Sequence, residues 1–246
     1  NGAAGDYTFD ATTSDSYNFS KTSTSIRLDT VATFGAVTAS SIGSSSADIS
    51  STAVGNDSVS TTSLEYQYAT TSNFTTILTT TAASPSSLTA SNSASDTTVT
   101  SAVSGLTPGT HYWVRLKATN TGGDSFSTAT DFWTAPTISS ANPDHGPLAG
   151  QSSVDLTGVG FNSGEVGNYT VKFGTETATN VTYINGTTLR VDAPSHVAGP
   201  VTVTIEHSGG ASFTTSTSIF DYFDKPAISG MSTYSGPIQG GNSLVI

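Results

Sequence analysis

The chain has 246 residues, of which 10% are charged, and it carries a formal net charge of −11 with only seven Lys and Arg residues. So few cations exclude a nucleic-acid-binding protein, because phosphate contacts require clustered Lys and Arg. No long apolar run or basic amphipathic helix predicts a membrane span or a membrane-surface helix. Cysteine is absent, which excludes disulfides and thiolate metal sites. About a third of the residues are Ser or Thr, and we expect them at the outward-facing positions of β-strands.

Residues 1–33 contain three short pieces in which apolar residues stand two apart, the period of a half-buried strand. Two such strands do not hold together alone in water. The segment is therefore either a flexible leader or a set of strands lent to another domain or another molecule. In the second case the assembly candidates are Tyr7, Phe9, Tyr17, Phe19, Ile26 and Leu28.

Residues 34–135 hold short strand-like runs separated by turn residues, without helical periodicity, which predicts a β-sandwich. The runs are Ala47–Ile49, Leu64–Tyr68, Val99–Val103, Tyr112–Ala118 and the surroundings of Phe126. The Ser/Thr-rich stretch from Thr79 to Ser101 is expected to form an expanded loop.

The stretch from Val103 to Asn120 resembles the signature of fibronectin type III domains. The positions that match the family pattern are Leu106, Pro108, Tyr112, Ala118 and Asn120. The resemblance implies that Tyr112 is the corner tyrosine, whose ring fills the end of the core while its hydroxyl bonds to upstream backbone. Domains of this family are usually spacers or binding modules, and the fold alone gives no function.

Residues 136–225 resemble the IPT/TIG immunoglobulin-like family. The resemblance rests on Pro136-Thr-Ile138, Gly146-Pro147, Val154 to Phe161, Val171 to Gly174, Leu189 to Pro194, Val201 to Ile205 and Phe220 to Tyr222. We expect Val171 and Phe173 to point inward, and Gly174 to turn the chain. Phe220 and Tyr222 are expected to close the sandwich. The predicted fold class is all-β, with tandem immunoglobulin-like β-sandwiches, fibronectin type III-like and then IPT/TIG.

Residues 226–246 repeat the start of this segment at a fixed offset of 90 positions. Pro226, Ile228 and Gly236-Pro237 fall on Pro136, Ile138 and Gly146-Pro147, and the apolar pair Leu244 and Ile246 falls on Val154 and Leu156. They are interpreted as the first strands of an incomplete second IPT/TIG repeat. A segment of this length cannot bury a core of its own. We therefore expect strands from elsewhere to complete the repeat, and we add Ile228, Leu244 and Ile246 to the assembly candidates.

No pattern in the chain predicts catalysis or a cofactor. His111, His145, His196 and His207 share no metal-type spacing, and we expect them to be solvated or capping residues. No nucleophile elbow, Walker loop or dinucleotide fingerprint is present, so the chain is interpreted as non-enzymatic. Asp144 and Asp192, in predicted loops, leave calcium as the one cofactor alternative.

Asn-x-Ser/Thr sequons make Asn18, Asn56, Asn73, Asn168, Asn180 and Asn185 candidates for glycosylation. In a chain this rich in Ser and Thr, about four such sequons arise by chance, so composition explains most of them. Four of the six, Asn56, Asn73, Asn168 and Asn185, lie in predicted turns or at loop edges, where a glycan fits.

The leading functional hypothesis is an extracellular or cell-surface structural protein that binds copies of itself head to tail by strand complementation and builds a filament. The rival hypothesis is a chain that continues into further IPT/TIG repeats. A second class is the stalk or binding module of an adhesin, with Trp113 or Trp133 stacking on glycans or other cell-surface polymers. A third class is an accessory region of a secreted polysaccharide-active enzyme.

Overall fold

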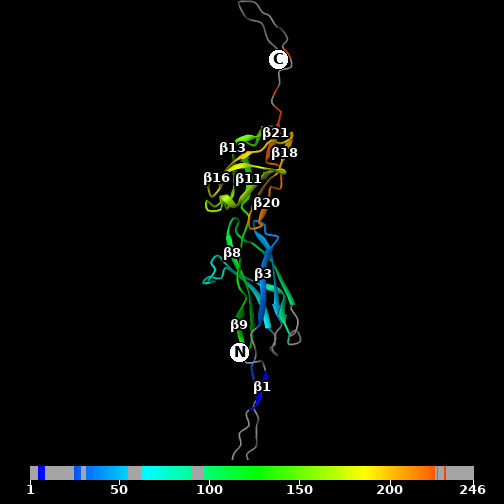
Figure 1. Ribbon diagram of the computed structural model, residues 1–246, viewed down its shortest axis with the longest axis vertical. Helices are drawn as coiled ribbons and strands as arrows, with labels where there is room; N and C mark the ends of the chain where they lie inside the picture. Colours follow the sequence, from blue (N-terminus) through cyan, green and yellow to red (C-terminus); the bar gives the residue numbers. More distant parts are fainter. Residues whose placement is uncertain are drawn as a thin grey trace, which may run out of the picture.

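The computed structural model describes residues 5–8, 25–28, 32–54, 62–89, 97–224, 226 and 230. Two β-sandwiches follow one another along the long axis of the molecule, and β1 lies beyond the far end of the first (Figure 1). The predicted all-β, tandem immunoglobulin-like class is confirmed.

The first sandwich is built from eight antiparallel strands. They are β3 (Thr33–Ser40), β4 (Ser46–Val54), β5 (Thr62–Ala69), β6 (Thr79–Leu88), β7 (Thr97–Ser104), β8 (His111–Asn120), β9 (Gly123–Phe126) and β10 (Thr130–Trp133). The pairing order is β10-β8-β5-β6-β7-β4-β3, with β9 on β8. Strand β6 pairs with β5 and, at Ser84, with β7, so it joins the two faces of the sandwich.

The expected loop from Thr79 to Ser101 is wrong, because β6 and the start of β7 occupy most of it. Ala83, Leu88 and Val99 point into the core and are at most 4% exposed. The Ser and Thr residues around them lie mostly on the solvent side, where Thr suits a pleated strand. A polar composition therefore concealed strands that bury only a few side chains each.

The corner tyrosine is confirmed. Tyr112 is buried and stacks on Phe132 at a ring-centroid distance of 5.8 Å. Its hydroxyl accepts a hydrogen bond of 2.9 Å from the backbone N–H of Thr107, five residues upstream. The contact closes the end of the sandwich from which the chain continues into the second one.

We expect Tyr112→Phe to lower the free energy of unfolding by about 1–3 kcal/mol, because the Thr107 N–H loses its acceptor in a partly buried place. Chemical denaturation monitored by circular dichroism measures the loss. Tyr183→Phe is the matched control, since the half-buried Tyr183 hydroxyl makes no hydrogen bond among the described residues. Equal effects of the two changes would contradict a corner role for Tyr112.

The second sandwich contains eleven strands and one short 3-10 helix. They are β11 (Thr137–Asn142), β12 (His145–Pro147), β13 (Gln151–Val159), η2 (Val166–Asn168), β14 (Tyr169–Phe173), β15 (Glu176–Thr177), β16 (Thr179–Asn185), β17 (Thr188–Ala193), β18 (Gly199–Val201), β19 (Val203–His207), β20 (Ser212–Thr214) and β21 (Phe220–Phe223). The sheet orders are β11-β13-β17-β16, β12-β21-β18 and β15-β14-β19-β20.

The core of the second sandwich contains the side chains predicted to point inward. Val171, Phe173, Val203 and Ile205 are fully buried, and the Phe173 and Phe220 rings meet edge to face at 5.0 Å. Gly174 adopts a positive φ of 62° in the turn after β14, as its predicted role requires. Because β14 and β19 are paired in one sheet, their alternation places the two apolar rows side by side on the same buried face.

The N-terminal strands β1 (Gly5–Thr8) and β2 (Ser25–Leu28) form a separate antiparallel ribbon. Tyr7 lies opposite Ile26, and Gly5 opposite Leu28. Among the described residues the ribbon pairs with no other strand, so each strand has one free edge.

Candidate functional site at the junction of the two sandwiches

A row of stacked rings crosses the boundary between the sandwiches. His111 and Trp133 lie parallel, 4.7 Å apart at 2° between planes, and come from the paired strands β8 and β10. The row continues into the second sandwich, where His207 stacks on Trp133 with the ring centroids 5.5 Å apart. Tyr169 meets His207 edge to face at 5.9 Å, so the row ends in the second core.

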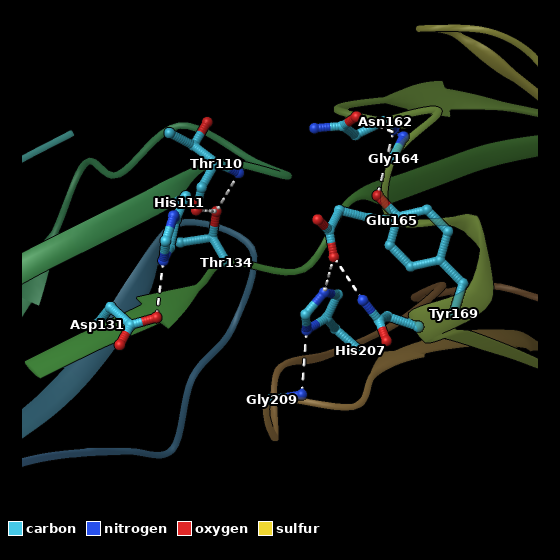
Figure 2. Close-up of polar contacts among 11 residues, drawn as sticks. Thr110, His111, Asp131, Thr134, Asn162, Gly164, Glu165, Tyr169, His207 and Gly209 are labelled. Atoms are coloured by element: carbon cyan, nitrogen blue, oxygen red, sulfur yellow. Dashed lines mark hydrogen bonds and ion pairs between the residues drawn. The ribbon is translucent and has the colours of Figure 1, made fainter. Parts of the chain in front are cut away.

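His207 is held by hydrogen bonds at both ring nitrogens (Figure 2). The Gly209 N–H donates to Nδ1 at 3.0 Å, so that nitrogen is unprotonated. Nε2 therefore carries the proton and donates it to Glu165 Oε2 at 3.1 Å. The side chain is only 4% exposed. His207 is not solvated, because the Trp133 ring and the Glu165 loop cover it, but it caps the turn after β19 by accepting the Gly209 N–H.

Glu165 connects this histidine to the rest of its loop. Its Oε2 also accepts a hydrogen bond of 2.7 Å from Asn168 Nδ2. The Asn168 hydrogen bond, followed by the His207 contact, lowers the pKa of Glu165, while partial burial opposes this shift. The ionised carboxylate is therefore the form that the junction favours.

We expect Glu165→Gln to remove part of the acid sensitivity of the protein. Because the pKa of Glu165 is lower in the folded protein, its ionised carboxylate stabilises the fold. This stabilisation is fully present at a pH above the unfolded-state pKa, and it is lost as the pH falls through the folded-state pKa. The melting temperature of the native chain should then fall more steeply between pH 5 and pH 3 than that of the variant (about one unit either side of the usual Glu range). The exposed Glu176→Gln is the control, and indistinguishable pH profiles for the native chain and Glu165→Gln would contradict the argument.

The backbones of the two sandwiches also touch directly. The Ser212 N–H donates to the Ile42 carbonyl at 3.1 Å, and Ala211 is buried in the core of the first sandwich. Phe213, in the same hairpin, packs against both cores. The hairpin between β19 and β20 therefore belongs structurally to both sandwiches.

Two glycines make the closest approach. Gly109, before β8, and Gly160, after β13, have positive φ values of 60° and 87°. A Cβ on Gly109 would collide with the carbonyl of Gly160, and a Cβ on Gly160 would lie 2.6 Å from the Pro108 oxygen. No side chain fits at either position while the sandwiches keep this contact.

Thr134 fixes the connecting segment between the sandwiches. Its hydroxyl donates to the Thr107 carbonyl at 2.7 Å. It also accepts a hydrogen bond of 2.9 Å from the Thr110 N–H (Figure 2). Next along the chain, the Ala135 N–H donates to the Gly43 carbonyl at 3.0 Å. These bonds fix Thr134 and Ala135 of the connector between β10 and β11 to the end of the first sandwich.

The described sequons divide into two kinds. Asn168 and Asn180 use their amide nitrogens to bond carboxylates, of Glu165 and Asp192 respectively. Asn73 and Asn185 instead accept hydrogen bonds at Oδ1 from the Thr two residues later, and their amide nitrogens have no partner among the described residues. Asn18 and Asn56 lie outside the described residues.

Only some of the assembly candidates can be placed. Tyr7, Ile26 and Leu28 lie in the β1–β2 ribbon. The remaining candidates, Phe9, Tyr17, Phe19, Ile228, Leu244 and Ile246, lie outside the described residues.

The described part of the chain contains no group of three or more His, Asp or Glu side chains that could hold a metal ion. The two aspartates considered for calcium have other partners. Asp144 pairs with His145 at 2.7 Å, and Asp192 accepts hydrogen bonds from Asn180 and from the Ser153 N–H. Within the same described residues, no helix is long and apolar enough to cross a membrane.

The outer face of β8 carries a second group of rings. Trp113 lies half-exposed on the opposite side of its strand from Tyr112, and its ring centroid is 5.4 Å from that of His111. Two residues on, the Arg115 guanidinium lies between the Phe74 and Phe126 rings, at 4.2 and 4.0 Å, and donates twice to Gln67 Oε1. Arg115 has no carboxylate partner among the described residues.

Sequence reasoning missed the junction cluster. Trp133 was considered as a ring that stacks on glycans, and its partners His207 and Glu165 lie far along the chain. The available signal was the pair of glycines beside Pro108 and Val159, whose shared role requires the two sandwiches to meet.

Residues 136–222 match the IPT/TIG domain family. A comparison with curated proteins found no match. Among solved structures, the chain is similar to the full extracellular region of plexin A4, domains 1 to 10, with 15% identity over 82% of this chain and 16% of that one, at a TM-score of 0.35. A second plexin A4 structure, domains 1 to 8, gives 13% identity, 78% and 18% coverage and a TM-score of 0.31. The FN1–FN3 domains of chicken CNTN1 give 12% identity, 78% and 66% coverage and a TM-score of 0.30. The chain thus spans less than a fifth of the plexin chains.

Proposed function

We propose that this protein is a non-enzymatic, extracellular structural protein whose two sandwiches act as one stiff segment of a surface filament. The observation that carries the proposal is the junction, where stacked rings, the buried Glu165–His207 pair and the two-glycine contact act together. A flexible linker between two binding domains would need none of these contacts. A segment that transmits force or sets the direction of a polymer needs them all.

Head-to-tail assembly by strand complementation is the finer part of the proposal. Residues 226–246 repeat the start of an IPT/TIG domain, and a sandwich begun there needs further strands. The free edges of the β1–β2 ribbon offer backbone N–H and C=O groups for strand addition. A contact between opposite ends of two copies does not close, and it therefore propagates into a fibre.

Glycosylation is part of the same proposal, and the structure ranks the described sequons. Asn73 lies exposed in a turn and Asn185 at the exposed end of β16, and the amide nitrogens of both are free of partners among the described residues. We expect intact mass to exceed that of the bare polypeptide, and Asn73→Gln and Asn185→Gln each to lower it by one glycan. Asn180→Gln, whose amide is bonded to Asp192, should leave the mass of attached sugar unchanged.

Negative-stain electron microscopy of the native material, with intact mass on the same sample, tests the assembly. Regular filaments are expected, with a subunit mass that exceeds the mass of the polypeptide by that of the attached glycans. Isolated rods with a much larger chain mass would overturn strand complementation between copies and would favour a stalk made of further repeats.

A binding module is the second candidate, favoured by the outer face of β8. Trp113 offers a half-exposed ring, and Arg115 next to it has no acidic partner among the described residues. On this reading, glycan-array binding is lost in Trp113→Ala and kept in Phe126→Ser. Absence of binding to any glycan or cell-surface polymer by the native chain would dismiss this candidate.

A further inference from the structure

The 90-residue repeat begins before Pro226. Asp221, Tyr222 and Phe223 fall on Asp131, Phe132 and Trp133, the last residues of β10. Phe132 and Tyr222 are both buried, in the first and the second core respectively. Each sandwich therefore ends on a strand with a buried aromatic residue, then an aromatic residue at the boundary, then a proline three positions later.

The environment of Phe223 resembles that of Trp133 without its partner. Trp133 has His111 on one face, and that histidine pairs with Asp131 at 2.8 Å. Phe223 meets His145 edge to face at 6.2 Å, whereas His111 and Trp133 are parallel. His145 likewise pairs with an aspartate, Asp144. Trp133 is then covered by the His207 ring of the following sandwich, whereas 54% of Phe223 is exposed.

An apolar groove surrounds Phe223 at this end of the second sandwich. The groove has a volume of about 290 Å³, and its lining is mostly apolar but includes one carboxylate. The lining residues are Pro143, His145, Gly146, Pro147, Gln151, Phe223, Asp224 and Pro226. Val197, 74% exposed, precedes β18, whose Gly199 pairs with Tyr222. Figure 1 shows β18 and β21 together at the end of the second sandwich away from the first. A concave, largely apolar surface around an exposed aromatic ring is typical of an interaction site.

We propose that this end is the docking surface for a second IPT/TIG-type sandwich that starts at Pro226, with Phe223 in the role that Trp133 has at the first junction. The proposal deepens the proposed function and rests on it for one point, that residues 226–246 begin a sandwich. The occupant follows from the repeat, because Pro226 lines the groove and leads directly into the repeated segment. The domain that continues from Pro136 covers Trp133 in the same way.

The chain contains no cysteine, so a single introduced thiol reports on the groove without interference. The experiment compares His145→Cys in the dissociated native chain and in an extended chain, in which residues 157–224 are added again after Ile246. Because Ile246 corresponds to Leu156, this addition completes the second repeat with the chain's own sequence. His145 lines the groove and its side chain is 64% exposed. We expect thiol labelling at position 145 to be at least tenfold slower in the extended chain, and Phe223→Ser to restore the fast rate.

Ile184→Cys is the control site, since it is exposed in β16 and comes just before the Gly186 turn that bonds Phe161, near the first junction. Its labelling should be equal in both chains. Equal labelling at position 145 in a folded extended chain would overturn the docking surface. If the added repeat does not fold, the labelling rate at position 145 is compared between assembled and dissociated native protein. Equal rates in this comparison would also overturn the docking surface. Protection in the extended chain together with an absence of filaments would refute the assembly and leave the docking surface standing.

Discussion

Trp133→Ala is expected to lower the free energy of unfolding by about 3 kcal/mol, the lower end of the range for removing a large aromatic side chain, because the ring is half-buried. The loss should also separate the two sandwiches thermodynamically. His111 and His207 would lose the ring on which both stack, and the apolar contacts that remain across the boundary include only small contributions such as Ala211 beside the ring of Phe213. We expect differential scanning calorimetry to show one cooperative transition for the native chain and two for the variant.

Trp113→Ala is the matched control, because Trp113 is the only other tryptophan and contacts the stack only through His111. This substitution should lower the free energy of unfolding by about 1 kcal/mol, the typical effect of a point substitution. The variant should keep the single calorimetric transition of the native chain. The same variant leaves Trp133 as the sole tryptophan, so its fluorescence reports on the junction directly. A single transition in Trp133→Ala, at unchanged stability, would show that the ring stack does not couple the sandwiches.

Gly109→Ala is expected to break the fixed geometry of the junction. An alanine at φ 60° costs about 1–2 kcal/mol in backbone strain alone. The added methyl group must also displace the Gly160 backbone, and overpacking of this kind typically costs a further 1–3 kcal/mol or so. Moving the sandwiches apart is the available relief, so small-angle X-ray scattering should show a broader distance distribution.

Gly105→Ala separates the two contributions. Gly105 has a similar φ of 76°, but a Cβ there would meet no atom within 4 Å. It should show the strain cost of about 1–2 kcal/mol with an unchanged scattering profile. Identical scattering changes in both variants would mean that strain, and not the contact with Gly160, controls the junction.

Alternation and turn residues were sufficient to predict much of this fold. The period-2 rows of β8, β14 and β19 identify their buried faces, because a strand with one face in a core must alternate. The corner contact of Tyr112 was implied by the resemblance of Val103 to Asn120 to fibronectin type III domains. The strands β6 and β7 were partly missed, since Ser and Thr suit both loops and solvent-facing strand positions.

The junction was decided only by tertiary structure. Glu165, His207 and Trp133 are up to 74 positions apart, and no local pattern connects a histidine at a strand end with a tryptophan in another domain. A glycine at positions 109 and 160 indicates a backbone conformation or a close contact that excludes other residues. The sequence does not say which atom would exclude a side chain there. Composition, periodicity and repeat spacing are local properties, so they determined the sandwiches and the 90-residue repeat. Contacts between the sandwiches depend on how two finished surfaces meet, and those surfaces exist only after each sandwich has folded.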